Sequence, residues 1–132
     1  MGEVSSDSPP TGESGGAPAG EEAQARGTAE SATLYDLRVV VERIEGRPVC
    51  GMRPGDWFEL TESSHLCTRP GRFFCVYALA SVLPLLAAKQ RQLPPGDWLE
   101  QDMHVACPDP DERVIMRIER TGQRTVALHE VT

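Results

Sequence analysis

The sequence predicts a single α+β domain, in which a small antiparallel sheet of four to five strands, in the order β-β-α-β-β, packs against one long helix. Three observations carry this prediction. Apolar and polar residues alternate over residues 35–42, almost every residue from 73 to 86 is apolar, and two alternating runs flank a turn-forming segment at 108–111. With 132 residues, the chain has the usual length of one domain.

The first 32 residues differ in composition from the rest, because they contain no Leu, Ile, Phe, Trp or Tyr and are rich in Gly, Ser, Pro, Ala and Glu. Such a segment cannot bury enough apolar surface to offset chain entropy, so we predict a disordered leader at 1–32 and the domain at 33–132. The leader is acidic. It has neither the basic start and apolar run of a secretion signal nor the Arg-rich composition of a transit peptide, which favours a cytoplasmic protein.

Each predicted element has its own pattern. The alternation at 35–42 is typical of a half-buried strand, and residues 57–61, with Phe58 and Leu60 on one face, form a short second strand. The polar, turn-rich residues 62–72 connect this strand to the helix.

The predicted helix begins near Arg72 and is apolar on almost every side, so we expect the sheet and loops to cover most of it. Pro84 has no amide hydrogen, so either the helix kinks there or a second short helix starts with this proline. The Pro-Pro-Gly run at 94–96 ends the helix. Because the apolar stretch falls short of the roughly 20 residues that span a bilayer, no membrane insertion is expected.

After the helix, residues 105–107 and 114–118 form a predicted β-hairpin. Residues 121–124 make another turn, and residues 125–131 return as an optional fifth strand at the edge of the sheet.

The charge pattern argues against a nucleic-acid partner. Four arginines occur at strand spacing, but three glutamates interrupt them, which indicates a mixed, solvated sheet face instead of a basic stripe. These residues are Arg38, Arg43, Arg113 and Arg117, with Glu42, Glu112 and Glu119.

The four cysteines are the main candidates for chemistry. Cys50, Cys67, Cys75 and Cys107 lie in a chain without an export signal, which favours reduced thiols over disulfides. No Cys-x-x-Cys pair occurs, so any shared site must be assembled by the fold. Cys75 falls in the first turn of the predicted helix, whose positive pole favours a thiolate, and is the first candidate for a reactive or metal-bound thiol. Packing as a small hydrophobe is the alternative for each cysteine.

The histidines add little to this candidate site. His104 and Cys107 would point to opposite faces of a regular strand, His65 and Cys67 are interpreted as a solvated loop pair, and His129 as a surface residue. The sequence has no Ser-His-Asp grouping that can be argued and no phosphate-binding glycine loop. Aspartates in turns are expected to bond to their own backbone.

The segment 39–120 resembles a family of small, functionally uncharacterised bacterial proteins of about ninety residues, a single-domain length. The shared pattern is a first strand, a cysteine, Gly-Asp-x-Phe, Gly-x-Phe-x-Cys-x-x-Ala, and a last cysteine followed by an acidic turn and a strand. In this chain the pattern consists of Cys50, Gly55, Asp56, Phe58, Gly71, Phe73, Phe74, Cys75, Ala78, Cys107, Ile118, Glu119 and Arg120. The resemblance implies that Cys50, Cys75 and Cys107 are the cysteines of the family and that Cys67 is an addition of this chain.

Three hypotheses follow. The first is a small non-enzymatic accessory domain in which Cys50, Cys75 and Cys107 bind zinc or an iron-sulfur cluster, with Cys67 or a water completing the ligand set. The second is a thiol-dependent redox protein with Cys75 as nucleophile and Cys50 or Cys107 as the resolving thiol. The third is an interaction domain for a protein partner, in which the cysteines only pack.

Overall fold

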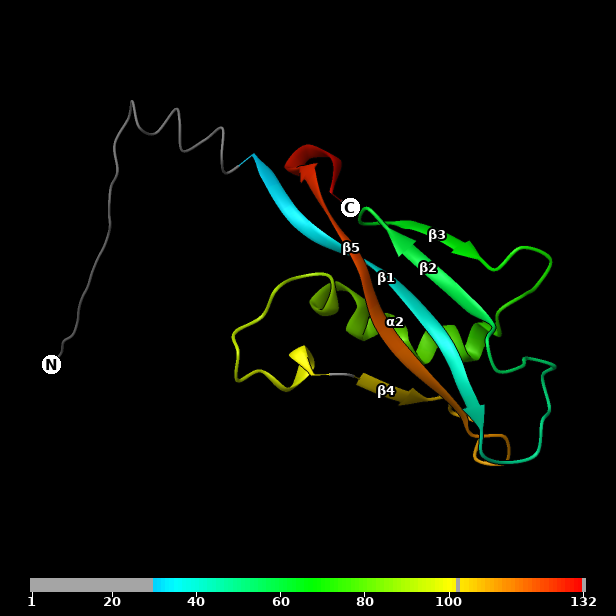
Figure 1. Ribbon diagram of the computed structural model, residues 1–132. Helices are drawn as coiled ribbons and strands as arrows, with labels where there is room; N and C mark the ends of the chain where they lie inside the picture. Colours follow the sequence, from blue (N-terminus) through cyan, green and yellow to red (C-terminus); the bar gives the residue numbers. More distant parts are fainter. Residues whose placement is uncertain (1–29, 102, 132) are drawn as a thin grey trace, which may run out of the picture.

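The computed structural model describes residues 30–101 and 103–131, and it contains one helix and a five-stranded antiparallel sheet (Figure 1). The predicted α+β class is therefore confirmed. The elements are β1 (Ser31–Ile44), β2 (Trp57–Thr61), β3 (His65–Thr68), α2 (Val76–Lys89), β4 (Met103–Ala106) and β5 (Val114–Ala127), with short 3-10 turns at Trp98–Glu100 and Leu128–Glu130. The strand order across the sheet is β3-β2-β1-β5-β4.

Strands β1 and β5 form the centre of the sheet, and their register runs from Ser31 opposite Ala127 to Ile44 opposite Val114. A register shift between Asp36 and Leu37 interrupts the alternation, so that Leu34 and Leu37 are both buried although they are three positions apart and would face opposite sides of a regular strand. The bulge thus lets a 14-residue strand keep one apolar face along its length.

Two strand predictions were wrong. Three strands, and not two, precede the helix. The additional strand, β3, is the hairpin partner of β2, and the sequence did not predict it because it is exposed at all four positions and carries no apolar alternation. A turn was predicted at 121–124 and a separate strand at 125–131. Residues 121–127 are instead the continuation of β5, which follows the first half of β1, and Leu128–Glu130 form a 3-10 turn. Strand β1 begins at Ser31, and the rest of the predicted leader, residues 1–29, lies outside the described residues.

Helix α2 is shorter and less covered than predicted. It has 14 residues and begins at Val76 instead of near Arg72, and Pro84 lies inside one continuous helix. Ala78, Val82 and Leu86 are buried against the sheet, whereas Val76 and Tyr77 are exposed. The helix crosses one face of the sheet, and among the described residues no helix covers the opposite face of the sheet (Figure 1). No helix in the described part of the chain is long and apolar enough to cross a membrane.

The core lies between α2 and the central strands. Phe58 of β2 is fully buried and meets Phe74, just before the helix, edge to face at a centroid distance of 4.9 Å. The other large side chains of this core are Leu37, Val39, Val41, Met52, Val82, Met116 and Ile118. This layer fixes the start of α2 against the sheet, and the candidate site forms beside it.

A cysteine-lined candidate site

Three cysteines from distant segments line one pocket of about 300 Å3. Cys50 lies in the loop between β1 and β2, Cys75 directly precedes α2, and Cys107 follows β4. These three segments meet at one end of the sheet (Figure 1). Apolar residues form most of the remaining lining, and two acidic residues, Asp109 and Glu112, complete it. The fold therefore brings together the three residues that the sequence singled out.

Cys75 is the N-cap residue of α2, one position before the predicted first turn. Its carbonyl accepts a hydrogen bond from Leu79 N–H at 2.9 Å, and its own N–H donates to the sulfur of Met52 at 3.3 Å. Its side chain makes no capping hydrogen bond. The thiol thus stands at the positive pole of the helix without being used to cap it.

Glu112 is the polar centre of the pocket wall. It is buried, with 3% exposure, and its Oε2 accepts hydrogen bonds from the N–H groups of Val49 at 2.8 Å and Cys50 at 3.1 Å. The Cys50 thiol donates to the same oxygen at 3.5 Å. Burial, together with the neighbouring Glu112 and Cys75, raises the pKa of the Cys50 thiol to about 11. At neutral pH, Cys50 is therefore a protonated hydrogen-bond donor.

The prediction that Glu112 lies on a solvated sheet face was wrong. The turn between β4 and β5 redirects it: Asp109 Oδ1 accepts a hydrogen bond from Asp111 N–H at 2.9 Å, and Arg113, with a φ of 50°, donates its N–H to the Asp109 carbonyl at 3.0 Å. The loop after β1 packs closely on this turn, because a Cβ on Gly46 would lie 1.9 Å from the Asp111 carbonyl oxygen. The acidic turn after Cys107 was visible in the sequence, but nothing in its local pattern indicated that Glu112 is buried.

Cys107 is held by the same turn. Its N–H donates to the Val114 carbonyl at 2.9 Å, and its sulfur accepts a hydrogen bond from Val114 N–H at 3.2 Å. This arrangement keeps the sulfur beside the backbone at the start of β5 and at the pocket wall.

A buried ion pair ties the Cys50 loop to the segment before Cys75. Asp56 is 1% exposed, and Arg72 donates to it from Nε at 2.8 Å and from a terminal nitrogen at 2.7 Å. Arg53 N–H donates to the same carboxylate at 2.8 Å, and Arg72 also donates to the Gly51 carbonyl at 3.0 Å. The Arg72 guanidinium lowers the pKa of Asp56. Asp56 thus does more than bond to its own turn.

The other candidates lie outside this pocket. Cys67 is exposed on β3, so it is not positioned to complete a ligand set with the other three cysteines. His104 Nε2 lies 2.9 Å from Glu42 Oε1, and His65 and His129 pair weakly with Glu62 and Glu130 on the surface.

In residues 30–101 and 103–131, no group of three or more His, Cys, Asp or Glu side chains is placed to hold a metal ion. The donor types in the pocket fit a thiophilic ion, but the side chains are not arranged as a finished ligand set.

No family model, curated protein or solved structure matches this chain. The resemblance to small bacterial proteins therefore stays a prediction, and the function must be argued from the pocket itself.

Proposed function

We propose that Cys50, Cys75 and Cys107 bind a thiophilic metal ion or an iron-sulfur cluster in a small domain without catalytic activity of its own. The observation that supports this proposal is the convergence of three cysteines, from three separate segments, on one pocket. Thiolate donors select zinc and iron-sulfur clusters over hard ions such as magnesium and calcium.

The size of the pocket favours more than a bare ion. Its volume of about 300 Å3 is roughly ten times the share of one water molecule in the liquid. Three protein sulfurs would leave one position of a tetrahedral ion open for an external ligand, or for Asp109 or Glu112. Because the thiols are not prearranged, binding must include rotation of the cysteine side chains.

The test is metal content of the full chain purified without oxygen. We expect about one zinc ion or one cluster per chain, and the same content in Cys67→Ser, which changes the exposed cysteine outside the pocket. Cys75→Ser should lower the content strongly, and the triple serine variant of Cys50, Cys75 and Cys107 should abolish it.

Cobalt(II) added to the metal-free chain gives a second readout, because cobalt-thiolate coordination produces a strong near-ultraviolet absorption. A metal-free wild-type chain that also shows no thiolate absorption with cobalt would contradict the proposal. Equal metal content in the wild type and the triple variant would do the same.

A second candidate is a thiol-disulfide exchange site, since Cys50, Cys75 and Cys107 line the same pocket. In this reaction, the Cys75 thiolate attacks a substrate disulfide, forms a mixed disulfide and releases the first substrate thiol. Cys50 or Cys107 then loses its proton and attacks Cys75, which releases the second substrate thiol and leaves a protein disulfide. The substrate gains two electrons and two protons in total.

Intact mass after treatment with oxidised glutathione separates the two candidates. The redox site predicts loss of two hydrogens in the wild type and in Cys67→Ser, and a persistent glutathione adduct on Cys75 when the resolving cysteine is removed. The metal site predicts that bound metal protects all three pocket thiols from this oxidation.

A further inference from the structure

A fourth sulfur atom lines the cysteine pocket. Met52 follows Cys50 by two positions, is 2% exposed, and belongs to the same pocket lining as the three cysteines. Its Sδ lies 3.3 Å from the backbone nitrogen of Cys75, whose N–H donates to it. The thioether is therefore held directly beside Cys75, at the start of α2.

The loop between β1 and β2 is built to bring Met52 to this place. Gly51 has a φ of 88°, which favours glycine, and its two neighbours, Cys50 and Met52, both line the pocket. The Gly51 carbonyl accepts a hydrogen bond from Arg72 at 3.0 Å. Because Arg72 also pairs with the buried Asp56, the same ion pair that ties the loops of the site together holds this turn.

The two carboxylates of the pocket are held by backbone N–H groups. Glu112 Oε2 accepts hydrogen bonds from two such groups and from the Cys50 thiol. Asp109 Oδ1 accepts hydrogen bonds from the N–H groups of Asp111 at 2.9 Å and Glu112 at 3.4 Å. No histidine is among the described residues that line the pocket. Sulfur is therefore the main donor type that the pocket offers to a metal ion.

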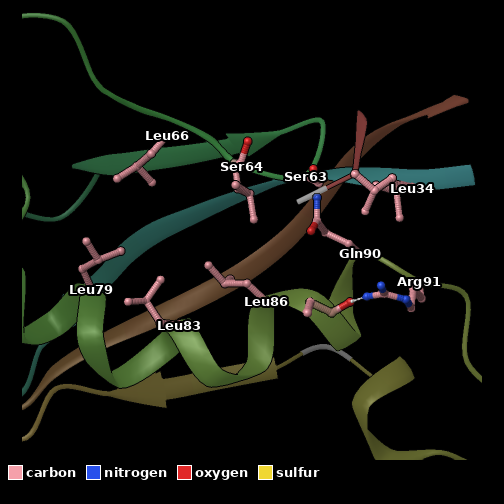
Figure 2. A pocket seen from close by; sticks show the side chains of 12 residues that line it. Leu34, Ser63, Ser64, Leu66, Leu79, Leu83, Leu86, Gln90 and Arg91 are labelled. Atoms are coloured by element: carbon pink, nitrogen blue, oxygen red, sulfur yellow. Dashed lines mark hydrogen bonds between the residues drawn. The ribbon is translucent and has the colours of Figure 1, made fainter. Parts of the chain in front are cut away.

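A second hollow of the domain has no such donors. It is an apolar groove of about 440 Å3 between α2 and β3, where Leu66 of β3 faces Leu79 and Leu83 of the helix and Arg91 lies at the opposite end (Figure 2). None of the described residues that line this groove carries sulfur. The sulfur atoms are thus gathered at the start of α2 and not spread along the helix.

The donor set distinguishes between thiophilic ions. Zinc in proteins is bound by thiolates, imidazoles and carboxylates, whereas copper(I) is softer and is selected by thioether as well as thiolate sulfur. A thioether sulfur has a second lone pair, so Met52 can accept the Cys75 N–H with one lone pair and bind an ion with the other. Four sulfur donors without a nitrogen ligand therefore match copper(I) better than zinc.

We propose that the ion of this site is copper(I), bound by the Met52 thioether together with the three pocket cysteines. This inference rests on the proposed function and narrows it: the cysteines hold a thiophilic ion in either case, and Met52 is the residue that favours copper(I). Each thiol that binds the ion releases its proton to solvent, and the ion stays in its reduced state. Zinc bound to the same cysteines would be displaced by copper(I).

The test is titration of copper(I) into the metal-free full chain, without oxygen and in competition with a colorimetric copper(I) chelator, and a parallel titration with zinc. Met52→Leu, which changes the volume of the side chain little, should weaken copper(I) binding at least about tenfold and leave zinc binding unchanged. Met116→Leu is the matched control, because Met116 is fully buried but lies outside the pocket. This control should leave copper(I) binding unchanged.

Selenomethionine labelling gives a direct readout that needs no substitution in the pocket. With copper(I) bound, X-ray absorption at the selenium edge should show a copper neighbour in the labelled wild-type chain. The same signal should persist in labelled Met116→Leu and disappear in labelled Met52→Leu.

Two results would overturn this inference and leave the cysteine site in place. One is equal copper(I) affinity of the wild type and Met52→Leu, with loss of copper from the triple serine variant of the pocket cysteines. The other is an iron-sulfur cluster on the cysteines with no copper neighbour at selenium, since such a cluster would not use Met52. Copper(I) and zinc binding that the triple serine variant retains in full would instead overturn the proposed function, and the inference with it.

Discussion

Replacement of Asp56 by asparagine tests whether the ion pair behind the candidate site holds its loops in place. The substitution keeps the shape of the side chain but removes the charge that accepts hydrogen bonds from Arg53 N–H and twice from Arg72. Breaking a buried pair by removing one charge costs about 3–5 kcal/mol. Since the Arg72 side chain keeps 19% exposure and gains some water, we expect Asp56→Asn to lower the free energy of unfolding by about 2–4 kcal/mol.

Urea unfolding of the full chain, followed by the fluorescence of the adjacent Trp57, measures this loss. Glu59→Gln is the matched control, because its partner Arg38 is 38% exposed and the substitution should cost no more than about 1 kcal/mol. The reasoning is refuted if the two variants lose similar stability.

The same variant has a defined pH dependence. The lowered pKa of Asp56 means that its contribution to stability is present above the unfolded pKa of about 3.9 and is lost as the pH falls through the lower folded value. The difference in stability between wild type and Asp56→Asn should therefore shrink in acid.

Three further results are expected at the pocket and in its loops. The pKa of Cys50 is raised in the folded protein, so its contribution to stability is present below the unfolded pKa of about 8.5 and is lost as the pH rises to about 11. The free energy of unfolding in urea should therefore decline over this pH window in the wild type. Cys50→Ala should lack this decline. Glu112→Gln should speed alkylation of Cys50 at neutral pH, measured by peptide mass spectrometry, and an unchanged rate would argue against the 3.5 Å hydrogen bond. Gly46→Ala should lower the melting temperature, because its Cβ meets the Asp111 carbonyl, whereas Gly122→Ala, with open space around it, should not.

Local patterns predicted the central parts of the fold and missed its edges. The alternation that begins at Tyr35 was informative because one face of β1 is buried. Strand β3 has no such pattern, because it is exposed on both faces. Its extended structure depends on pairing with β2, which a local pattern does not reveal. The turn predicted at 121–124 failed for a related reason: pairing with β1 overrides the local preference of Gly122.

The candidate site shows the same division between local and long-range information. Cys75 was placed near the start of a helix from the apolar run that follows it. The burial of Glu112 could not be read from its neighbours, because the pairing of Gly46 and Arg47 with the turn before β5 covers it, and that contact joins segments more than sixty residues apart. The sequence also did not predict that one side of α2 is exposed, because a run of apolar residues does not indicate which other segments will cover it.

The two hollows of this domain share one helix but offer opposite chemistry. The start of α2 presents Cys75 to a pocket with two further thiols, while its last turns line an apolar groove that ends at Arg91. Val82, fully buried between them, packs against the sheet from the middle of the same helix. A rigid shift of α2 along the sheet would change both hollows at once.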